Sequence, residues 1–161
     1  MTFFHKNIRL PADRYVGQQW YFLTLCCDGR QPEFSIPEIA RRLIEILRRT
    51  SETAQFSIYA YCVMPDHVHM LVCGLAETSD LLVFVKRLKQ ITSFEFRRRF
   101  GRNLWQKKFY DHILRKNEQP AAIASYIWMN PMRKGLCADP RKYEFFGSFS
   151  FDWKKSLIGP S

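Results

Sequence analysis

Hydrophobic positions follow two different periodicities along the chain, which predicts a mixture of strands and helices. Four short stretches are almost continuously apolar or aromatic, as buried strands are, and three others repeat apolar residues at helical spacing. The predicted strands cover 19–26, 56–63, 67–74 and 104–114, the last being either a strand or an extended segment. The predicted helices begin after Ser35, cover 80–100 and cover 121–130, where Pro131 interrupts the pattern.

The first predicted helix starts with a local capping signal. Ser35 precedes the helix as its N-cap, and Glu38 stands three residues later, where it can complete a capping box. Phe34 can pack on Ile39 as a hydrophobic staple. This pattern predicts a first turn that is held by side-chain hydrogen bonds.

The order of the predicted elements is strand, helix, strand, strand, helix, strand, followed by a further helix. This order is typical of the ferredoxin-like fold, an α+β architecture with a β-α-β-β-α-β antiparallel sheet. The added C-terminal helix carries Tyr126. We expect residues 1–161 to form a single domain, with a basic N-terminal arm over about 1–16 and a tail over about 140–161. A ferredoxin-like fold by itself specifies no function.

The charge balance points to a polyanionic partner. The 161 residues include 25 Lys or Arg and 15 Asp or Glu, which gives a formal net charge of +10. A domain that is this basic, and 16% aromatic, has the composition of a phosphate-backbone binder. An anionic membrane is the competing partner, but no run approaches the roughly 18 apolar residues of a spanning helix. The first residues also lack the apolar core of a signal peptide, so we expect no membrane association.

The five cysteines show no pattern of a covalent or metal framework. Their number is odd and they form no C-x-x-C pair, which argues against disulfides and against a zinc ribbon. We therefore expect reduced core cysteines in a cytosolic protein.

Two histidines lie at positions i and i+2 in the third predicted strand. Because side chains alternate along a strand, His67 and His69 point from the same face. Two neutral imidazoles on one face are half of a metal site. Two polar residues of a half-exposed strand would give the same pattern, so the pair alone leaves both interpretations open.

The last predicted helix carries a phenol and an amide one turn apart. Tyr126 and Asn130 stand at i and i+4 and so share a helix face. If that face lies on the histidine strand, Asn130 can join the two histidines as a third ligand beside the phenol. The structural alternatives are a half-buried aromatic at Tyr126 and a helix cap at Asn130, directly before Pro131.

Three segments together resemble a known enzyme family. Met64–Leu71 resembles the histidine-hydrophobe-histidine motif of the single-tyrosine HUH transposases, a superfamily of IS200-like transposases. Leu104–His112 and Tyr126–Gly135 resemble their REP-associated branch, the REP-associated tyrosine transposases. The resemblance extends from about residue 9 to about residue 151. It implies that His67, His69 and Asn130 bind a divalent metal; insertion-sequence relatives more often use glutamine as the third ligand.

The resemblance also implies a mechanism. A Mg²⁺ or Mn²⁺ ion held by those three residues would polarise a scissile DNA phosphate, and Tyr126 would attack it. The products would be a 5′-phosphotyrosine and a free 3′-hydroxyl, and a second 3′-hydroxyl could reverse the step and join strands. Such an enzyme serves DNA transposition or repeat mobilisation. Tyr110 is the competing nucleophile, but it lies on an extended segment, and His112 is better explained by a structural role.

The expected partner is single-stranded DNA or the foot of a DNA hairpin, because exposed bases can stack on aromatics while basic side chains follow the backbone. The candidate DNA contacts are Arg14, Lys86, Arg87, Arg97, Arg98, Lys107, Lys108, Arg133 and Lys134. The REP-associated branch implies palindromic target repeats and a bacterial cytoplasmic protein that acts on nucleoid DNA. It also implies a monomer that uses its own tyrosine, with a tyrosine-swapped dimer as the alternative.

Two other functions fit parts of the sequence. A non-catalytic nucleic-acid-binding module would present Trp20, Tyr59 and Tyr61 from an open ferredoxin-like sheet. A small structural metal protein would use only His67 and His69. The co-occurrence of both histidines with Tyr126 and Asn130 favours the nuclease, because a pure binding module does not need them.

Overall fold

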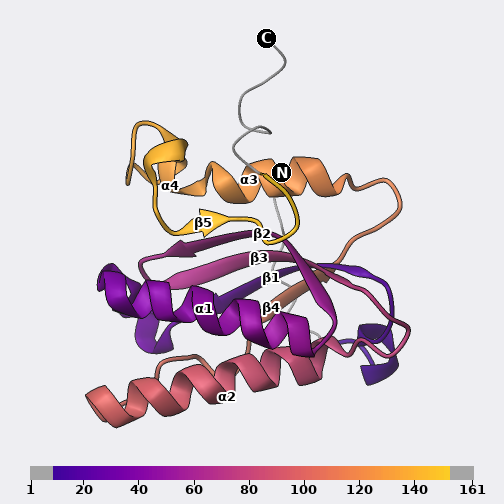
Figure 1. Ribbon diagram of the computed structural model, residues 1–161, viewed down its shortest axis with the longest axis horizontal. Coiled ribbons are helices and arrows are strands. Elements are labelled where there is room, and N and C mark those ends of the chain that lie inside the picture. The colour runs from indigo at the N-terminus through magenta and orange to yellow at the C-terminus, as the bar shows by residue number, and fades with distance from the viewer. Residues whose placement is uncertain (1–8, 153–161) are drawn as a thin grey trace.

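Five antiparallel strands form one sheet in the computed structural model, which describes residues 9–152 (Figure 1). The spatial order is β4-β1-β3-β2-β5. The strands are β1 (Trp20–Cys26), β2 (Phe56–Met64), β3 (His67–Gly74), β4 (Tyr110–Ile113) and β5 (Phe146–Gly147). The α-helices are α1 (Pro37–Thr53), α2 (Leu81–Phe100), α3 (Pro120–Trp128) and α4 (Asn130–Arg133). Short 3₁₀ turns are η1 (Ala12–Tyr15), η2 (Asp28–Arg30), η3 (Glu33–Ser35) and η4 (Pro140–Lys142).

The first four strands confirm the ferredoxin-like prediction. β1 pairs with both β3 and β4, and β2 pairs with β3 as an antiparallel hairpin closed by Pro65 and Asp66. The apolar continuity of β1 reflects its central place between these two partners. β5 is an addition that the sequence pattern did not predict, and it pairs with β2 at the far edge.

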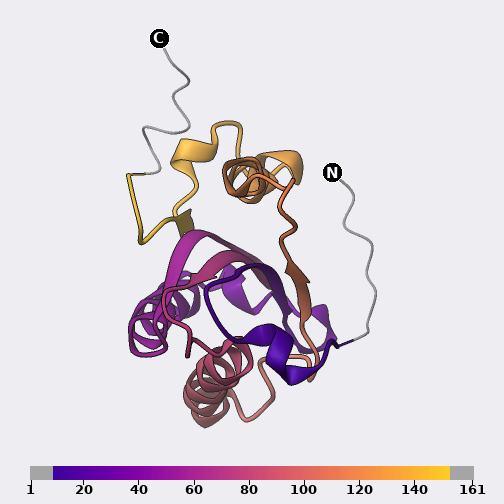
Figure 2. The same cartoon turned by 90° about the vertical axis from the view of Figure 1, so that its right-hand side faces the viewer.

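Helices cover both faces of the sheet. α1 and α2 pack on one face, where Leu23, Met70 and Val72 point into the larger core. α3 packs on the other face, where Phe22 and Leu71 meet residues of α3 in a second core. Figures 1 and 2 show the α1 and α2 layer on one side of the sheet and α3 on the other. The helix that carries Tyr126 therefore lies over the face from which His69, two residues before Leu71, also points.

The predicted cap of the first helix is wrong. Ser35 belongs to η3, and α1 begins at Pro37 with Ile36 in the N-cap position and no side-chain cap. Proline fixes its own φ near the helical value and lacks the N–H that a cap would satisfy, so it is favoured in a first turn. Pro37 therefore decides where the helix starts, ahead of the local Ser35 signal.

The third helix ends earlier than predicted. α3 stops at Trp128, Met129 forms the junction, and Asn130 begins the separate helix α4 with Pro131 in its first turn. Pro131 has no N–H to donate back to the preceding turn, which explains the break. Tyr126 and Asn130 thus lie on two consecutive helices rather than on one continuous face.

The segments near the ends differ in part from the expectation. Within the predicted 104–114 segment only β4 is a regular strand, and Trp105 forms an isolated bridge with Cys27. The predicted tail contains η4 and β5, and its last nine residues lie outside the described ones, as do the first eight residues of the predicted arm. All five cysteines are free thiols. Between residues 9 and 152, no helix combines the length and apolarity that crossing a bilayer requires.

Candidate active site

The two histidines of β3 face each other on the side of the sheet that α3 covers. His67 lies opposite Cys26 of β1, and His69 lies opposite Thr24. The imidazole centroids are 4.6 Å apart, and the two Nε2 atoms are separated by 3.1 Å. Two ligand atoms about 2.1 Å from one cation stand about 3.0 Å apart at a right angle and about 3.4 Å apart at a tetrahedral angle. The observed spacing therefore suits two neighbouring ligands of a single ion.

The opposite ring nitrogens are already bonded to protein groups. His67 Nδ1 lies 2.6 Å from Asp66 Oδ1, and His69 Nδ1 lies 2.8 Å from Thr24 Oγ1. A carboxylate or hydroxyl that accepts from Nδ1–H leaves the Nε2 lone pair as the ligand, which is the usual arrangement behind metal-bound histidines. Both rings are thus oriented with Nε2 toward the shared space.

Burial keeps both imidazoles neutral. It lowers the pKa of His67, although Asp66 acts in the opposite direction. For His69, burial together with the neighbouring His67 and Arg133 lowers the pKa to about 3. A neutral imidazole is the form that binds a metal ion, so no proton has to be removed at neutral pH.

Asp66 is held in turn by Arg30. Arg30 Nε lies 3.0 Å from Asp66 Oδ2, and Arg30 Nη1 contacts Cys26 Sγ at 2.8 Å. Arg30 adopts a left-handed backbone conformation with φ of 54°, directly after Gly29 at 58°. A left-handed residue with a side chain costs roughly 1–2 kcal/mol. The conformation directs the guanidinium to the carboxylate that orients His67.

Arg133 connects Tyr126 with Asn130. Its guanidinium carbon lies 4.0 Å from the centroid of the Tyr126 ring, and Nη2 donates to the Tyr126 carbonyl at 2.7 Å. The same Nη2 contacts Asn130 Oδ1 at 3.4 Å. Because the charge of Arg133 also helps to lower the pKa of His69, this arginine links the tyrosine helix to the histidine pair.

The side-chain amide of Asn130 offers an oxygen atom that could serve as a third metal ligand. Its side chain is 4% exposed, and its buried Nδ2 has no hydrogen-bond partner in the part of the chain that the structure describes. A buried amide group without a partner is costly, and a half-turn of the amide would bring the oxygen to that position at the expense of the 3.4 Å contact. The described residues contain no cluster of three His, Cys, Asp or Glu side chains suited to a metal. An amide oxygen together with two imidazole nitrogens is a donor set that suits a hard or borderline divalent cation.

Tyr110 lies on the same face as the histidines, which the sequence did not indicate. It pairs with Thr24, and its ring meets Phe22 edge-on at 6.1 Å, while Phe22 stacks on His69 at 5.4 Å. Burial, followed by the charge of Asp111, raises the pKa of Tyr110 and so disfavours its phenolate. Tyr110 is therefore a second phenol near the candidate site.

His112 has a structural partner. Its Nε2 lies 2.9 Å from both carboxylate oxygens of Glu118, and the same carboxylate accepts from the Arg115 backbone N–H at 2.6 Å. These bonds join β4 to the segment that leads into α3.

The nine predicted DNA contacts are all exposed but do not form one surface. Arg133 and Lys134 follow the α3–α4 junction, and the charges of both lower the pKa of His69. Lys107 and Lys108 precede β4, and Arg14 lies in η1. The remaining four, Lys86, Arg87, Arg97 and Arg98, are on α2, across the sheet from the histidines.

The aromatic residues of the alternative binding module are also separated. Tyr61 is buried on the α1 and α2 side of the sheet, where it packs against Phe149. Trp20 and Tyr59 contact each other on the α3 side, next to the second core. These three rings therefore do not share an exposed sheet face, and α3 covers the face that such a module would offer to bases.

Comparison with known proteins decides the family. Residues 15–130 match the family model described as "Transposase IS200 like". The chain belongs to this family. A Haemophilus influenzae protein with the provisional name REP-associated tyrosine transposase is 27% identical over 149 residues, covering 85% of this chain and 83% of that protein. The REP-associated tyrosine transposase of Escherichia coli is 25% identical over 146 residues, covering 85% of each chain.

A solved structure of a family member has the same fold. The REP-associated tyrosine transposase bound to a REP hairpin superimposes with a TM-score of 0.66 at 19% identity, covering 91% of this chain and 82% of that one. The sequence alone named His67, His69, Tyr126 and Asn130 as candidate site residues, and their roles stay a prediction. It missed the Arg30–Asp66 pair: the only local signal was a carboxylate directly before His67.

Proposed function

We propose that this transposase is a metal-dependent single-stranded DNA endonuclease and strand transferase that acts at or near palindromic hairpins through Tyr126. The observation that carries the proposal is the pair of neutral, facing Nε2 atoms on His67 and His69, on the sheet face that the tyrosine helix covers. A protein that only binds DNA has no need for two desolvated imidazoles oriented in this way.

The proposed metal ligands are His67 Nε2, His69 Nε2 and the side-chain oxygen of Asn130. Two nitrogens and one oxygen suit Mn²⁺, and they suit Mg²⁺ when water completes the shell. When bound, the ion supplies Lewis-acid stabilisation of negative charge on the scissile phosphate. Asp66 and Thr24 keep the two imidazoles in the ligand tautomer.

Tyr126 is the proposed nucleophile. Its phenolic oxygen attacks phosphorus, the bond from phosphorus to the 3′-oxygen breaks, and a 5′-phosphotyrosine and a 3′-hydroxyl result. The phenolic proton passes to solvent, and the departing 3′-oxygen takes up a proton. The bond to tyrosine conserves the phosphodiester linkage, so attack by another 3′-hydroxyl rejoins DNA and frees Tyr126. Arg133, at 4.0 Å from the ring centroid, holds the ring and adds positive charge beside the phosphate.

The proposed substrate is a hairpin with single-stranded DNA at its foot. The relative that is bound to a REP hairpin supports this choice, as do the exposed charges of Arg133 and Lys134 near the histidines. α3 packs on the sheet of its own chain, which favours a monomer that uses its own tyrosine.

The direct test uses a labelled oligonucleotide in which a palindromic hairpin is flanked by single strands. With Mn²⁺ or Mg²⁺ the protein should cut one strand and retain the 5′-phosphate end through a bond that survives denaturing gel electrophoresis. EDTA should abolish the reaction, and a fully paired duplex should not be cut. Tight hairpin binding without cleavage under any divalent metal would instead support the non-catalytic binding module.

The Asp66 carboxylate should control metal affinity. In Asp66→Ala we expect Mn²⁺ affinity to fall by about 10–100-fold, because His67 loses the group that fixes its ring and tautomer. Calorimetry or the electron paramagnetic resonance of free Mn²⁺ measures this without any turnover. Arg30→Ala should give a smaller loss in the same direction, since Asp66 loses its ion pair.

Asp139→Ala is the matched control for Asp66→Ala. Asp139 is held by Arg141 of η4, and the charge change is the same. Equal Mn²⁺ affinity in Asp66→Ala and Asp139→Ala would remove Asp66 from the proposed site.

A further inference from the structure

The outward face of α2 is basic and carries an exposed aromatic ring. Phe94 is 64% exposed, and a shallow hollow in the surface is lined by Arg87, Gln90, Ile91, Phe94, Glu95, Arg98 and Arg99. The guanidinium carbon of Arg98 lies 5.7 Å from the Phe94 ring centroid. Of the 20 residues of α2, six are Lys or Arg and only Glu95 is acidic. Phe94 is the most exposed of the large hydrophobic side chains in the described chain.

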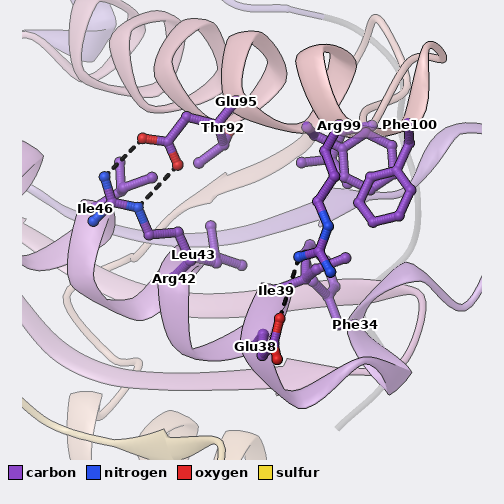
Figure 3. Close-up of a pocket in the computed structure, with 12 residues that line it drawn as sticks. Phe34, Glu38, Ile39, Arg42, Leu43, Ile46, Thr92, Glu95, Arg99 and Phe100 are labelled. Atoms are coloured by element: carbon purple, nitrogen blue, oxygen red, sulfur yellow. Dashed lines mark hydrogen bonds and ion pairs between the residues drawn. The ribbon is translucent and has the colours of Figure 1, made fainter.

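The one acidic residue that lines this hollow, Glu95, is paired with an arginine of α1. Glu95 accepts two hydrogen bonds from Arg42 of α1, at 2.9 and 2.7 Å, and Arg99 reaches Glu38 of α1 at 3.3 Å. Figure 3 shows both pairs crossing the seam between the two helices. Arg87 and Arg98, by contrast, form no ion pair with any residue between 9 and 152. Neither guanidinium is therefore neutralised by a direct ion pair within the described chain.

This basic face is separate from the candidate active site. α1 and α2 cover the side of the sheet opposite the histidines, and α3 covers the histidine side (Figure 2). DNA held at Tyr126 cannot lie along α2 as well unless the strand continues around the molecule. The two surfaces must contact different parts of a DNA substrate.

We propose that the outward face of α2, formed by Arg87, Phe94 and Arg98, binds the single-stranded DNA that flanks the segment held at the active site. The proposal rests on the proposed function for the identity of the ligand. Arg87 and Arg98 are 11 positions apart, about 16 Å along the helix, enough to span several phosphates. Guanidinium groups bind phosphate oxygens as two-pronged donors, and Phe94 offers a stacking surface for an unpaired base.

The chemistry of the face favours a nucleic acid over a membrane. A helix that lies on a lipid surface needs a continuous apolar face for the bilayer. The apolar side of α2, with Leu81, Phe84 and Leu88, is buried in the core instead. What remains outside is arginine with an isolated ring, which is the combination found in single-strand binding surfaces.

The test compares two oligonucleotides bound to Tyr126→Phe protein, so that binding is measured without cleavage. One is the bare hairpin, and the other carries a flank of about 20 thymidines. We expect the flank to increase affinity, and Arg87→Glu/Arg98→Glu to remove that increase, with about a tenfold loss for the flanked DNA only. The salt slope for flanked DNA should fall by about 1.4, since each phosphate contact on a single strand contributes about 0.7. Phe94→Ser should weaken only the flanked complex, by about fivefold.

Lys116→Glu/Lys142→Glu is the matched control, because it makes the same charge change at two exposed positions outside α2. It should not alter the gain in affinity that the flank provides.

Equal loss of affinity for bare and flanked DNA in the α2 variant, or no loss at all, would overturn the proposal. A membrane-binding result would also overturn it. In that case the protein would float with phosphatidylserine vesicles, the α2 variant would not, and the variant would leave the affinity for flanked DNA unchanged. If the wild-type protein cleaves no DNA substrate with any divalent metal, the proposed function fails. The proposal for α2 can still be tested, because it is measured as DNA affinity and not as cleavage.

Discussion

Tyr126→Phe should abolish both DNA cleavage and the covalent protein–DNA product, with a loss of at least about 10³-fold in the cleavage rate. The variant removes a single oxygen atom. The remaining ring can still lie under Arg133, and the hydrogen bond from Arg133 to the backbone carbonyl of residue 126 is unaffected. Fold and hairpin affinity should therefore be retained. Single-turnover cleavage and gel-shift titration on the same protein separate the two quantities.

Tyr110→Phe is the demanding control for this result. Tyr110 is a second phenol on the same sheet face, and it reaches the histidines through Phe22. Removing its hydroxyl should leave the cleavage rate within a few-fold of wild type. A covalent product that persists in Tyr126→Phe and disappears in Tyr110→Phe would transfer the nucleophile to Tyr110.

His67→Ala and His69→Ala should each lower metal-supported cleavage by more than about 100-fold. Each variant removes one of two Nε2 atoms that stand 3.1 Å apart, and one imidazole with an amide is a weak site for a divalent ion. Excess Mn²⁺ should restore part of the activity, whereas Tyr126→Phe should not respond. Asn130→Ala should lower the cleavage rate less than either histidine variant, because water can take the place of one oxygen ligand.

Folding must be checked separately for the histidine variants. His69 is half-buried and stacks on Phe22, so alanine leaves a void beside that ring, and His69→Gln is the better-filled replacement that still lacks the imidazole. Unfolding curves close to wild type would assign the lost activity to the site. Full cleavage by folded His67→Ala protein would remove the histidine pair from the mechanism.

The periodicity of the chain predicted most of the fold because its elements are locally encoded. The H-V-H alternation of β3 and the short turn after β2 fix a hairpin by themselves. β5 could not be found in this way, since Phe146 and Gly147 form a strand only by pairing with Cys62 and Tyr61 of β2. The predicted start of α1 at Ser35 was wrong although the information is local. Two neighbouring signals for a helix start compete there, and the helix begins at Pro37.

The candidate site was predictable where its residues are close in sequence. His67 with His69, and Tyr126 with Asn130, are each a short-range pair. Thr24 lies 45 positions from His69, and Arg30 lies 36 positions from Asp66, so their contacts depend on how β1 and η2 meet β3. The basic residues were recognised by charge alone, and charge does not say which side of the sheet a helix covers. For this reason the sequence prediction placed Arg87 and Arg98 in the same set of DNA contacts as Arg133, although they lie on opposite sides of the sheet.

The most direct test is to trap the reaction between wild-type protein, the flanked hairpin and Mn²⁺, digest both components, and locate the nucleotide by mass spectrometry. We expect the added nucleotide phosphate on the peptide that contains Tyr126 and on no other. The same mass on the Tyr110 peptide, or cleaved DNA with every tyrosine peptide unmodified, would contradict a phosphotyrosine mechanism at Tyr126.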